Sequence, residues 1–359
     1  MTPLGRLLAR RIAATGPMTV ADYTAECLMH PEHGYYATRD PFGAAGDFVT
    51  APEISQMFGE LLGLALAQAW LDRGAPSPAV LAELGPGRGT LMADALRAAP
   101  QVLGFRAAMA VHLVEGSPVL RARQAEALEA AGVTWHESVS ALPERPLFLV
   151  ANEFLDALPI RQFVREGAGW RERMVGLADR DGGGRLAFGL SPAAPRPELA
   201  HRLADTAEGE VVETCAPAAA VVVEVAERVA RHGGVALFLD YGGWRSRGDT
   251  LQAVWRHGFA DPLAEPGEAD LTAHVDWEPV ASAAAAAGAQ VAGPVPQGVL
   301  LERLGITARA GALARGMACA ALEAHVAAHR RLTHPDGMGT LVQALAVFDR
   351  GATPPGFAV

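Results

Sequence analysis

Lysine is absent from the 359-residue sequence, so all 30 basic residues are arginine. Without lysine a chain cannot form a side-chain Schiff base, anchor pyridoxal phosphate or supply the phosphate-binding lysine of a P-loop. The formal net charge of −10 and the lack of a dense arginine cluster argue against nucleic acid as a partner, because that affinity depends on neutralising phosphates. A cationic or neutral substrate suits such an acidic chain better.

Cysteine and long apolar runs are also scarce. Cys27, Cys215 and Cys319 are odd in number and far apart, so they predict neither a disulfide framework nor a cysteine metal site. No apolar run approaches the roughly 20 residues of a membrane span, and the first residues lack the apolar core of a secretory signal. We therefore expect no metal, no membrane association and a cytoplasmic location.

Asparagine occurs once, at Asn152. In a composition rich in alanine, glycine, arginine and proline, a single asparagine suggests that its amide is needed. A chance surface or turn position is the alternative.

The order of apolar segments predicts an α/β protein. From about residue 79, strand-like stretches alternate with helical patterns: AVLAEL, AMAVHLVE, VTWHESV and PLFLVANEF, with a further strand at about 235–240. This alternation is typical of a doubly wound, mostly parallel sheet with helices on both faces. Residues 160–200 instead predict an antiparallel meander, which we interpret as the start of an inserted α+β subdomain. The last fifty residues are expected to be helical.

The sequence predicts five segments. They are an N-terminal helical region with a lid loop and a long helix from about Glu53 to Trp70 (1–75), the first half of a cofactor-binding core (76–160), an inserted substrate-recognition subdomain (161–232), the second half of the core (233–308) and a C-terminal helical region (309–359).

The stretch AELGPGRGTL joins the first predicted strand to the next helix and contains Gly85, Gly87 and Gly89. Such glycines allow a ligand to approach the backbone closely, and the helix that follows presents free N–H groups. The spacing differs from the G-x-G-x-x-G of dinucleotide folds, and Glu83 ahead of the turn would repel a pyrophosphate by about 1 to 4 kcal/mol at ~4 Å. S-adenosylmethionine carries an ammonium, a sulfonium and a ribose diol but no phosphate, so it fits better. A merely flexible turn is the alternative.

Polar residues also follow the second and third predicted strands. Glu115 stands where a bidentate acceptor for ribose hydroxyls belongs, with helix capping as its alternative. Glu137 and Ser138 are placed to flank an adenine, although a solvated loop explains them equally well.

The fourth predicted strand ends in VANEFLDALP, which brings Glu153 and Asp156 to the rim of the same crevice. Methyl transfer requires the acceptor lone pair to lie in line with the methyl group and the charge passing to the acceptor to be offset. Carboxylates do this best for a guanidinium. Glu153 and Asp156 are therefore the predicted catalytic residues of a direct in-line transfer to arginine, and a solvated helix start with Asp156 as its cap is the alternative.

These motifs resemble the MidA-like methyltransferase family over nearly the whole chain. The matching stretches are HPEHGYY, GDFVTAPEISQMFGELLG, ELGPGRGTLM, VEGSPVLRARQ, ANEFLDALPIRQF, FLDYGG, GDTLQAV, HGFADPL and ADLTAHVDW. One departure is Leu155, where the family usually has phenylalanine. The resemblance implies a class I, Rossmann-like fold with a seven-stranded sheet. The mitochondrial members of this family assist assembly of respiratory complex I, and members are implicated in symmetric dimethylation of an arginine on its 49 kDa, NuoD-like subunit. The resemblance implies a related activity for this chain.

The residues and the resemblance together predict a protein arginine methyltransferase with S-adenosyl-L-methionine as cofactor and S-adenosyl-L-homocysteine as product. The expected acceptor is a protein, the NuoD-like subunit or a related one, and a homodimer is compatible with this. A small-molecule methyltransferase and a cofactor-binding assembly chaperone without transfer activity are the alternatives. The expected cofactor contacts are Gly46, Asp47, Phe48, Thr50, Glu83, Gly85, Pro86, Gly87, Gly89, Thr90, Glu115, Glu137, Ser138 and Asn152. Asp240, Tyr241 and His274 are expected on the acceptor side.

Overall fold

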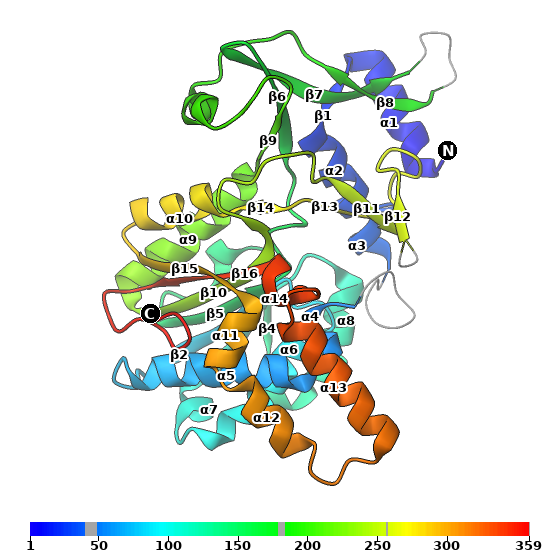
Figure 1. The fold of residues 1–359 in the computed structure, drawn as a ribbon. Helices are drawn as coiled ribbons and strands as arrows, with labels where there is room; N and C mark the ends of the chain where they lie inside the picture. The colour runs from blue at the N-terminus through cyan, green and yellow to red at the C-terminus, as the bar shows by residue number, and fades with distance from the viewer. Residues whose placement is uncertain (40–48, 179–183, 256–257, 359) are drawn as a thin grey trace. The chain divides into compact units, whose positions relative to one another are not determined.

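The computed structural model describes residues 1–39, 49–178, 184–255 and 258–358. The chain divides into two compact units, each assembled from separate stretches of sequence (Figure 1). The first unit is Met1–Phe48, Asp156–Ala218 and Gly243–Asp276, and the second is Val49–Leu155, Ala219–Gly242 and Trp277–Val359. The five segments expected from the sequence are a different partition and stay a prediction.

Within the described residues, the second unit is built on a path of seven strands in the order β15-β16-β10-β5-β2-β3-β4. The strands from β10 to β4 pair in parallel, and β16 is antiparallel to both of its neighbours. Their bounds are β2 Ala79–Leu84, β3 Met109–Val114, β4 Thr134–His136, β5 Leu147–Asn152, β10 Gly234–Gly243, β15 Gln290–Pro296 and β16 Val342–Phe348. The predicted doubly wound, mostly parallel sheet is confirmed.

Helices cover both faces of this sheet, as Figure 1 shows, with α9 and α10 on one side and α5, α11 and α12 on the other. The helices of this unit are α4 Ala51–Ile54, α5 Gln56–Leu71, α6 Thr90–Ala98, α7 Phe105–Ala108, α8 Pro118–Ala127, α9 Ala216–His232, α10 Trp277–Ala286, α11 Gln297–Arg303, α12 Ile306–Leu313, α13 Cys319–Thr333 and α14 Met338–Leu341, with short 3-10 turns at Ala99–Gln101, Glu129–Ala131 and Val139–Ala141. Strands β2 and β5 are buried along their whole length, as a sheet covered on both faces requires.

The long helix expected from Glu53 to Trp70 is interrupted. Ser55 has extended dihedral angles between α4 and α5, and its side-chain oxygen accepts the Met57 N–H at 3.3 Å. A serine side chain that satisfies a free helical N–H starts a new helix. α5 then packs closely on α6, because Gly63 lies so near Ala95 that a Cβ at Gly63 would be 2.6 Å from the Ala95 Cβ.

The helical expectation for the last fifty residues is wrong at β16, Val342–Phe348. This strand is inserted between β10 and β15, and all its residues except Gln343 are buried. A short run that is apolar on both faces has no clear period, so local sequence does not separate a central strand from a buried helix.

The first unit is an α+β assembly of antiparallel sheets. One sheet follows the order β1-β7-β6-β9, with β8 also paired to β7, and another follows β12-β11-β13. Its elements are α1 Pro3–Thr15, β1 Met18–Thr19, α2 Val20–Met29, α3 Tyr35–Thr38, β6 Arg161–Glu166, β7 Gly169–Leu177, β8 Leu186–Leu190, the 3-10 helix η4 Pro197–Ala204, β9 Val211–Thr214, β11 Gln252–Trp255, β12 Gly258–Ala260, β13 Asp270–Thr272 and β14 Val275–Asp276. The predicted antiparallel insertion is therefore present, joined in this unit by the N-terminal helices.

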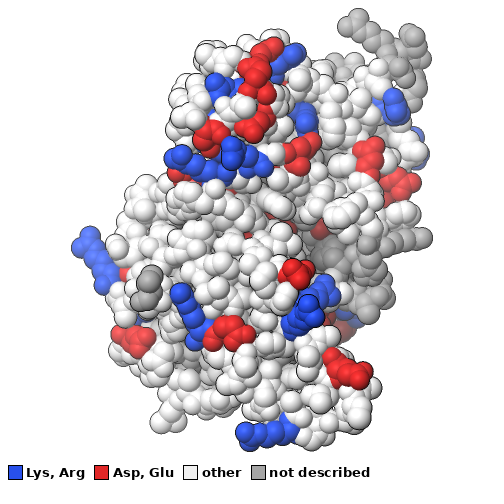
Figure 2. All heavy atoms as spheres, in the orientation of Figure 1, with Lys and Arg blue, Asp and Glu red and all other residues white. Residues whose placement is uncertain are grey.

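Acidic and arginine side chains lie side by side on the upper part of the face in Figure 2. In the first unit Glu172 accepts from Arg161 at 2.6 Å and from Arg196 at 3.1 Å. These pairs neutralise charge locally on β6 and β7. Among the described residues, no helix is long and apolar enough to cross a membrane, and no cluster of three metal-binding side chains occurs.

Candidate cofactor and methyl-transfer site

The predicted site residues of the second unit gather at one edge of its sheet. Leu84 at the end of β2 pairs with Val114 on β3 and Ala151 on β5, and Asn152 pairs with Leu239 on β10. Parallel strands end at the same edge, so the segments that follow β2, β3, β5 and β10 meet there. In open α/β sheets this edge is where ligands bind.

The glycine turn after β2 adopts left-handed conformations, which glycine enters without steric cost. The φ angles are +59° at Gly85, +53° at Gly87 and +85° at Gly89. A Cβ at Gly85 would also lie 2.8 Å from the Phe154 ring, so backbone and space both require glycine there. Pro86 is buried within the turn, and α6 begins directly after Gly89.

Two buried oxygen atoms at this edge, Glu83 Oε2 and Asn152 Oδ1, have no hydrogen-bond partner among the described residues. Glu83 is 3% exposed, and Asn152 turns its amide nitrogen toward Glu153 at 3.1 Å. An unpaired buried acceptor is costly unless a ligand satisfies it. S-adenosylmethionine offers ammonium, hydroxyl and adenine amino donors, so these residues fit that cofactor, and the lone asparagine of the sequence is one of them.

Burial raises the pKa of Glu83 to about 8, and the nearby charge of Glu115 acts in the same direction. A backbone hydrogen bond from Met92 opposes the shift. Glu83 is therefore largely protonated at neutral pH until a cation approaches it.

Glu115 follows β3 and is also buried. Its Oε1 accepts the Ser117 N–H at 2.7 Å, and its Oε2 accepts from Gln124 Nε2 at 3.1 Å. Burial raises the pKa of Glu115 against these hydrogen bonds. Sequence reasoning missed Gln124, whose signal is a polar residue on the buried face of α8.

Glu153 is one of three non-glycine residues with positive φ among the described residues, at +50°. Its Oε1 accepts the Ala51 N–H and the Asn152 amide, both at 3.1 Å. Burial raises the pKa of Glu153, while these donors, the Tyr241 side chain and the charge of Arg331 lower it. Strained backbone at a ligand-binding edge is typical of functional residues.

Asp240, on β10, is a buried acid that holds the segment after β5. Its Oδ2 accepts the N–H groups of Phe154 at 3.1 Å and Leu155 at 2.8 Å, and its Oδ1 accepts that of Tyr241 at 2.9 Å. With 1% exposure and three backbone donors, Asp240 is arranged to hold backbone. Tyr241 is the more accessible of the two residues predicted for the acceptor side on this strand.

The predicted lid, the loop at residues 46–53, is only partly described. Gly46, Asp47 and Phe48 lie outside the described residues, and Thr50 stands directly before α4. At the first position of α6, the Thr90 hydroxyl donates to the Glu53 carboxylate on α4. This bond joins the end of the predicted lid to the glycine turn.

Four predicted residues remain: Glu137, Ser138, Asp156 and His274. Glu137 and Ser138 are exposed after β4, where the Ser138 hydroxyl lies 2.7 Å from that of Ser140. Asp156 and His274 belong to the first unit.

In the first unit, Asp156 is buried close enough to Tyr36 to contribute to the raised pKa of that phenol, of which burial is the main cause. The His274 N–H donates to the Thr250 hydroxyl at 2.8 Å, and burial lowers the pKa of His274.

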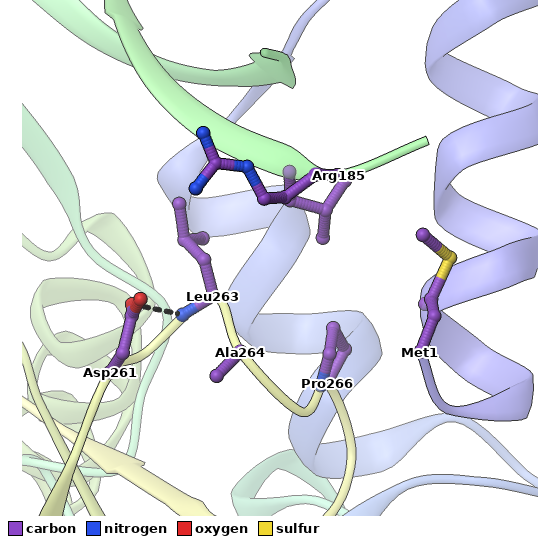
Figure 3. Close-up of a pocket in the computed structure, with 8 residues that line it drawn as sticks. Met1, Arg185, Asp261, Leu263, Ala264 and Pro266 are labelled. Atoms are coloured by element: carbon purple, nitrogen blue, oxygen red, sulfur yellow. Dashed lines mark hydrogen bonds between the residues drawn. The ribbon is translucent and has the colours of Figure 1, made fainter. Parts of the chain in front are cut away.

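The first unit also contains a pocket of about 400 Å³, shown in Figure 3. Arg185 and Asp261 line it beside apolar side chains, and Asp261 accepts the Leu263 N–H at 2.9 Å. None of the described residues predicted for the site lines this pocket.

The sequence matches the S-adenosyl-L-methionine-dependent methyltransferase family over residues 61–295. It is 37% identical to the Drosophila melanogaster "Protein arginine methyltransferase NDUFAF7 homolog, mitochondrial", over 96% of this chain and 84% of that protein. It is 38% identical to the human "Protein arginine methyltransferase NDUFAF7, mitochondrial", over 86% and 75% respectively. The fold is similar to that of a Burkholderia thailandensis protein solved with S-adenosyl-homocysteine, with a TM-score of 0.82, 34% identity and coverage of 99% of this chain and 92% of that one.

The expected cytoplasmic location is wrong, because these relatives are named mitochondrial proteins. The expectation rested on the lack of a secretory apolar core. That criterion concerns export and does not separate the cytoplasm from the interior of an organelle.

Proposed function

Because the chain belongs to the S-adenosyl-L-methionine-dependent methyltransferase family, we propose that it methylates an arginine side chain of a partner protein. The observation that carries the proposal is Glu153, a carboxylate held in a left-handed conformation at the edge of the sheet where cofactors of such folds bind. Relatives named as protein arginine methyltransferases support the acceptor type.

The cofactor contacts are proposed on the geometry of the second unit. Glu83 Oε2 and Asn152 Oδ1 would accept from its polar groups, Glu115 would accept from its ribose hydroxyls, and the backbone of the glycine turn would approach it closely. When bound, this cofactor supplies an electrophilic methyl group on a positively charged sulfur.

Glu153 would act on the acceptor. A carboxylate paired with a guanidinium localises positive charge on the bonded nitrogens and leaves a lone pair more available on the remaining one. Methyl transfer requires the guanidinium to lose a proton. Because burial raises the pKa of Glu153, this carboxylate would accept that proton more readily than an ordinary carboxylate does. Asp240 would serve by holding the backbone after Glu153, rather than by contacting the acceptor as the sequence suggested.

The identity of the acceptor follows from resemblance alone. A NuoD-like subunit of respiratory complex I, or a related protein, is the proposed partner, and a homodimer is compatible with it. The inserted segment 161–232 and the predicted lid would serve to receive an acceptor larger than a small molecule.

The test is transfer of labelled methyl groups from the cofactor to the recombinant subunit, with mass spectrometry of its arginines. Glu153→Gln should lower kcat by about 100-fold or more, while the affinity for S-adenosyl-L-homocysteine changes less than threefold. The matched control is Glu144→Gln, which alters a glutamate 69% exposed in its side chain and should leave kcat unchanged.

Full turnover by Glu153→Gln would remove the catalytic role of this carboxylate. Cofactor binding without label on any protein would instead support an assembly chaperone without transfer activity. Label on small molecules of a cell extract would support a small-molecule methyltransferase.

A further inference from the structure

Gln124 is a fully buried polar side chain on α8 that makes three hydrogen bonds. Its Nε2 donates to the Gly87 carbonyl at 2.8 Å and to Glu115 Oε2 at 3.1 Å. Its Oε1 accepts the indole N–H of Trp135, from β4, at 2.9 Å. One amide therefore links the glycine turn, the acid after β3 and the neighbouring strand.

The orientation of this amide is fixed by chemistry. An indole N–H donates and cannot accept, so the Gln124 carbonyl must face Trp135. The NH₂ group must then face Gly87 and Glu115, both of which offer acceptors. No other orientation of the amide satisfies all three neighbours.

Both groups that receive the NH₂ hydrogens belong to the proposed cofactor site. Gly87 is the central glycine of the turn, with φ at +53°, and a bond to its carbonyl fixes the tilt of that peptide. Glu115 accepts from the Ser117 N–H on Oε1 and from Gln124 on Oε2, and a backbone hydrogen bond from Gly116 also reaches this carboxylate. A carboxylate offers about four lone-pair positions, so these three donors leave room for a bond from a ligand hydroxyl.

We propose that Gln124 is a positioning residue that sets the Glu115 carboxylate and the Gly87 peptide for a nucleoside ligand with an intact ribose diol. The inference rests on the proposed cofactor function. To that function the inference adds a residue that determines how strongly the protein distinguishes a ribose from a deoxygenated sugar.

The experiment compares two ligands by calorimetry: S-adenosyl-L-homocysteine and its 2′,3′-dideoxy analogue. Gln124→Met keeps the length of the side chain and removes its hydrogen bonds. Since a hydrogen bond to a charged group contributes a factor of roughly ten or more, the variant should bind the diol ligand about tenfold more weakly. Its affinity for the dideoxy analogue should fall less than threefold.

Two further variants make the result specific. Trp135→Phe removes the indole donor that orients the amide while keeping an aromatic ring, and it should produce a smaller loss that is again confined to the diol ligand. Gln68→Met makes the same substitution at an exposed glutamine of α5 that bonds Asp72 at 2.8 Å, and it should change neither affinity.

Equal losses for both ligands in Gln124→Met, or no loss for either, would overturn the proposal, because a general structural role does not distinguish the two sugars. A wild-type protein that binds both ligands equally would overturn it as well. A diol-specific loss together with no methyl transfer to protein would leave Gln124 in place and remove only the proposed acceptor.

Discussion

Cofactor binding should be coupled to the loss of a proton from Glu83. In the free protein burial raises the pKa of this carboxyl to about 8. The ammonium of the cofactor favours the ionised form, because an opposite charge close to a buried acid lowers its pKa. Affinity should therefore rise with pH until the pH exceeds the pKa of the free protein.

The size of the effect follows from that pKa. With a value of about 8, Glu83 is ionised in about 1% of molecules at pH 6, about 9% at pH 7 and about half at pH 8. If only the ionised form binds, the affinity rises roughly tenfold between pH 6 and 7 and roughly fivefold between pH 7 and 8. About 0.9 proton is released for each ligand bound at pH 7.

Calorimetry with S-adenosyl-L-homocysteine in buffers of different ionisation enthalpy measures the released proton directly. Glu83→Gln, which does not titrate, should bind with an affinity independent of pH in this range and release almost no proton. Methylthioadenosine lacks the ammonium and should show no pH dependence in the wild-type protein.

The reasoning is refuted if the wild-type protein releases no proton at pH 7 while it binds the ligand. It is also refuted if Glu83→Gln shows the same pH dependence as the wild type, since the proton then comes from another group.

Three further predictions test the structure of the second unit. Burial is the main cause that lowers the pKa of His112 to about 4. The contribution of this neutral histidine to the free energy of unfolding is therefore complete above pH 6.5, and up to about 3 kcal/mol of it is lost as the pH drops from 6.5 to 4. Urea unfolding of His112→Asn should not show this loss. Gly85→Ala should lower the free energy of unfolding by about 1 to 2 kcal/mol and should weaken cofactor binding at least tenfold. The control is Gly74→Ala, at a glycine that also has positive φ but lies in open space, and it should lower the free energy of unfolding without changing cofactor affinity. Burial raises the pKa of Glu60, but its partners Arg97 and Arg309 outweigh this effect, so the pKa is lowered. The ion pairs therefore stabilise the fold above about pH 4.5, and this stabilisation is lost as the pH falls through the lowered pKa. Glu60→Gln should lower the free energy of unfolding in urea by about 1 to 3 kcal/mol at pH 7.

The sheet of the second unit was predictable because its information is local. β2 and β5 are six-residue strands that are apolar except for one polar residue near the end of each, Glu83 and Asn152, and both are buried along their whole length. The glycine turn after β2 carries its conformation in its residue types. β16 was not predictable, since this run of seven residues directly after α14 becomes a strand only through pairing with β10 and β15. Tertiary pairing overrides local preference in such segments.

The site divides in the same way. Glu83, Glu115 and Asn152 were predicted because each ends a strand that the sequence already identifies. Gln124 was missed because its role depends on Gly87, 37 residues earlier in the chain, and on the indole of Trp135. The order of elements places strand ends together, but it does not say which side chain of a helix points back into that edge.

Asp240 shows why the acceptor side was harder still. A non-glycine residue in the left-handed region costs about 1 to 2 kcal/mol, so the conformation of Glu153 must be held by bonds to other parts of the chain. The Glu153 N–H donates to the Leu239 carbonyl at 2.9 Å, and Asp240 accepts the next two N–H groups of the same segment, so β10 fixes three successive peptides after β5. An acid at the end of a strand predicts a ligand contact from its position alone, yet the lone pairs of Asp240 are directed to the backbone that follows Glu153, the proposed catalytic carboxylate. Glu153, the residue proposed to contact the acceptor, and Asp240, which holds its segment in place, are therefore both acids, and their hydrogen-bond partners distinguish them.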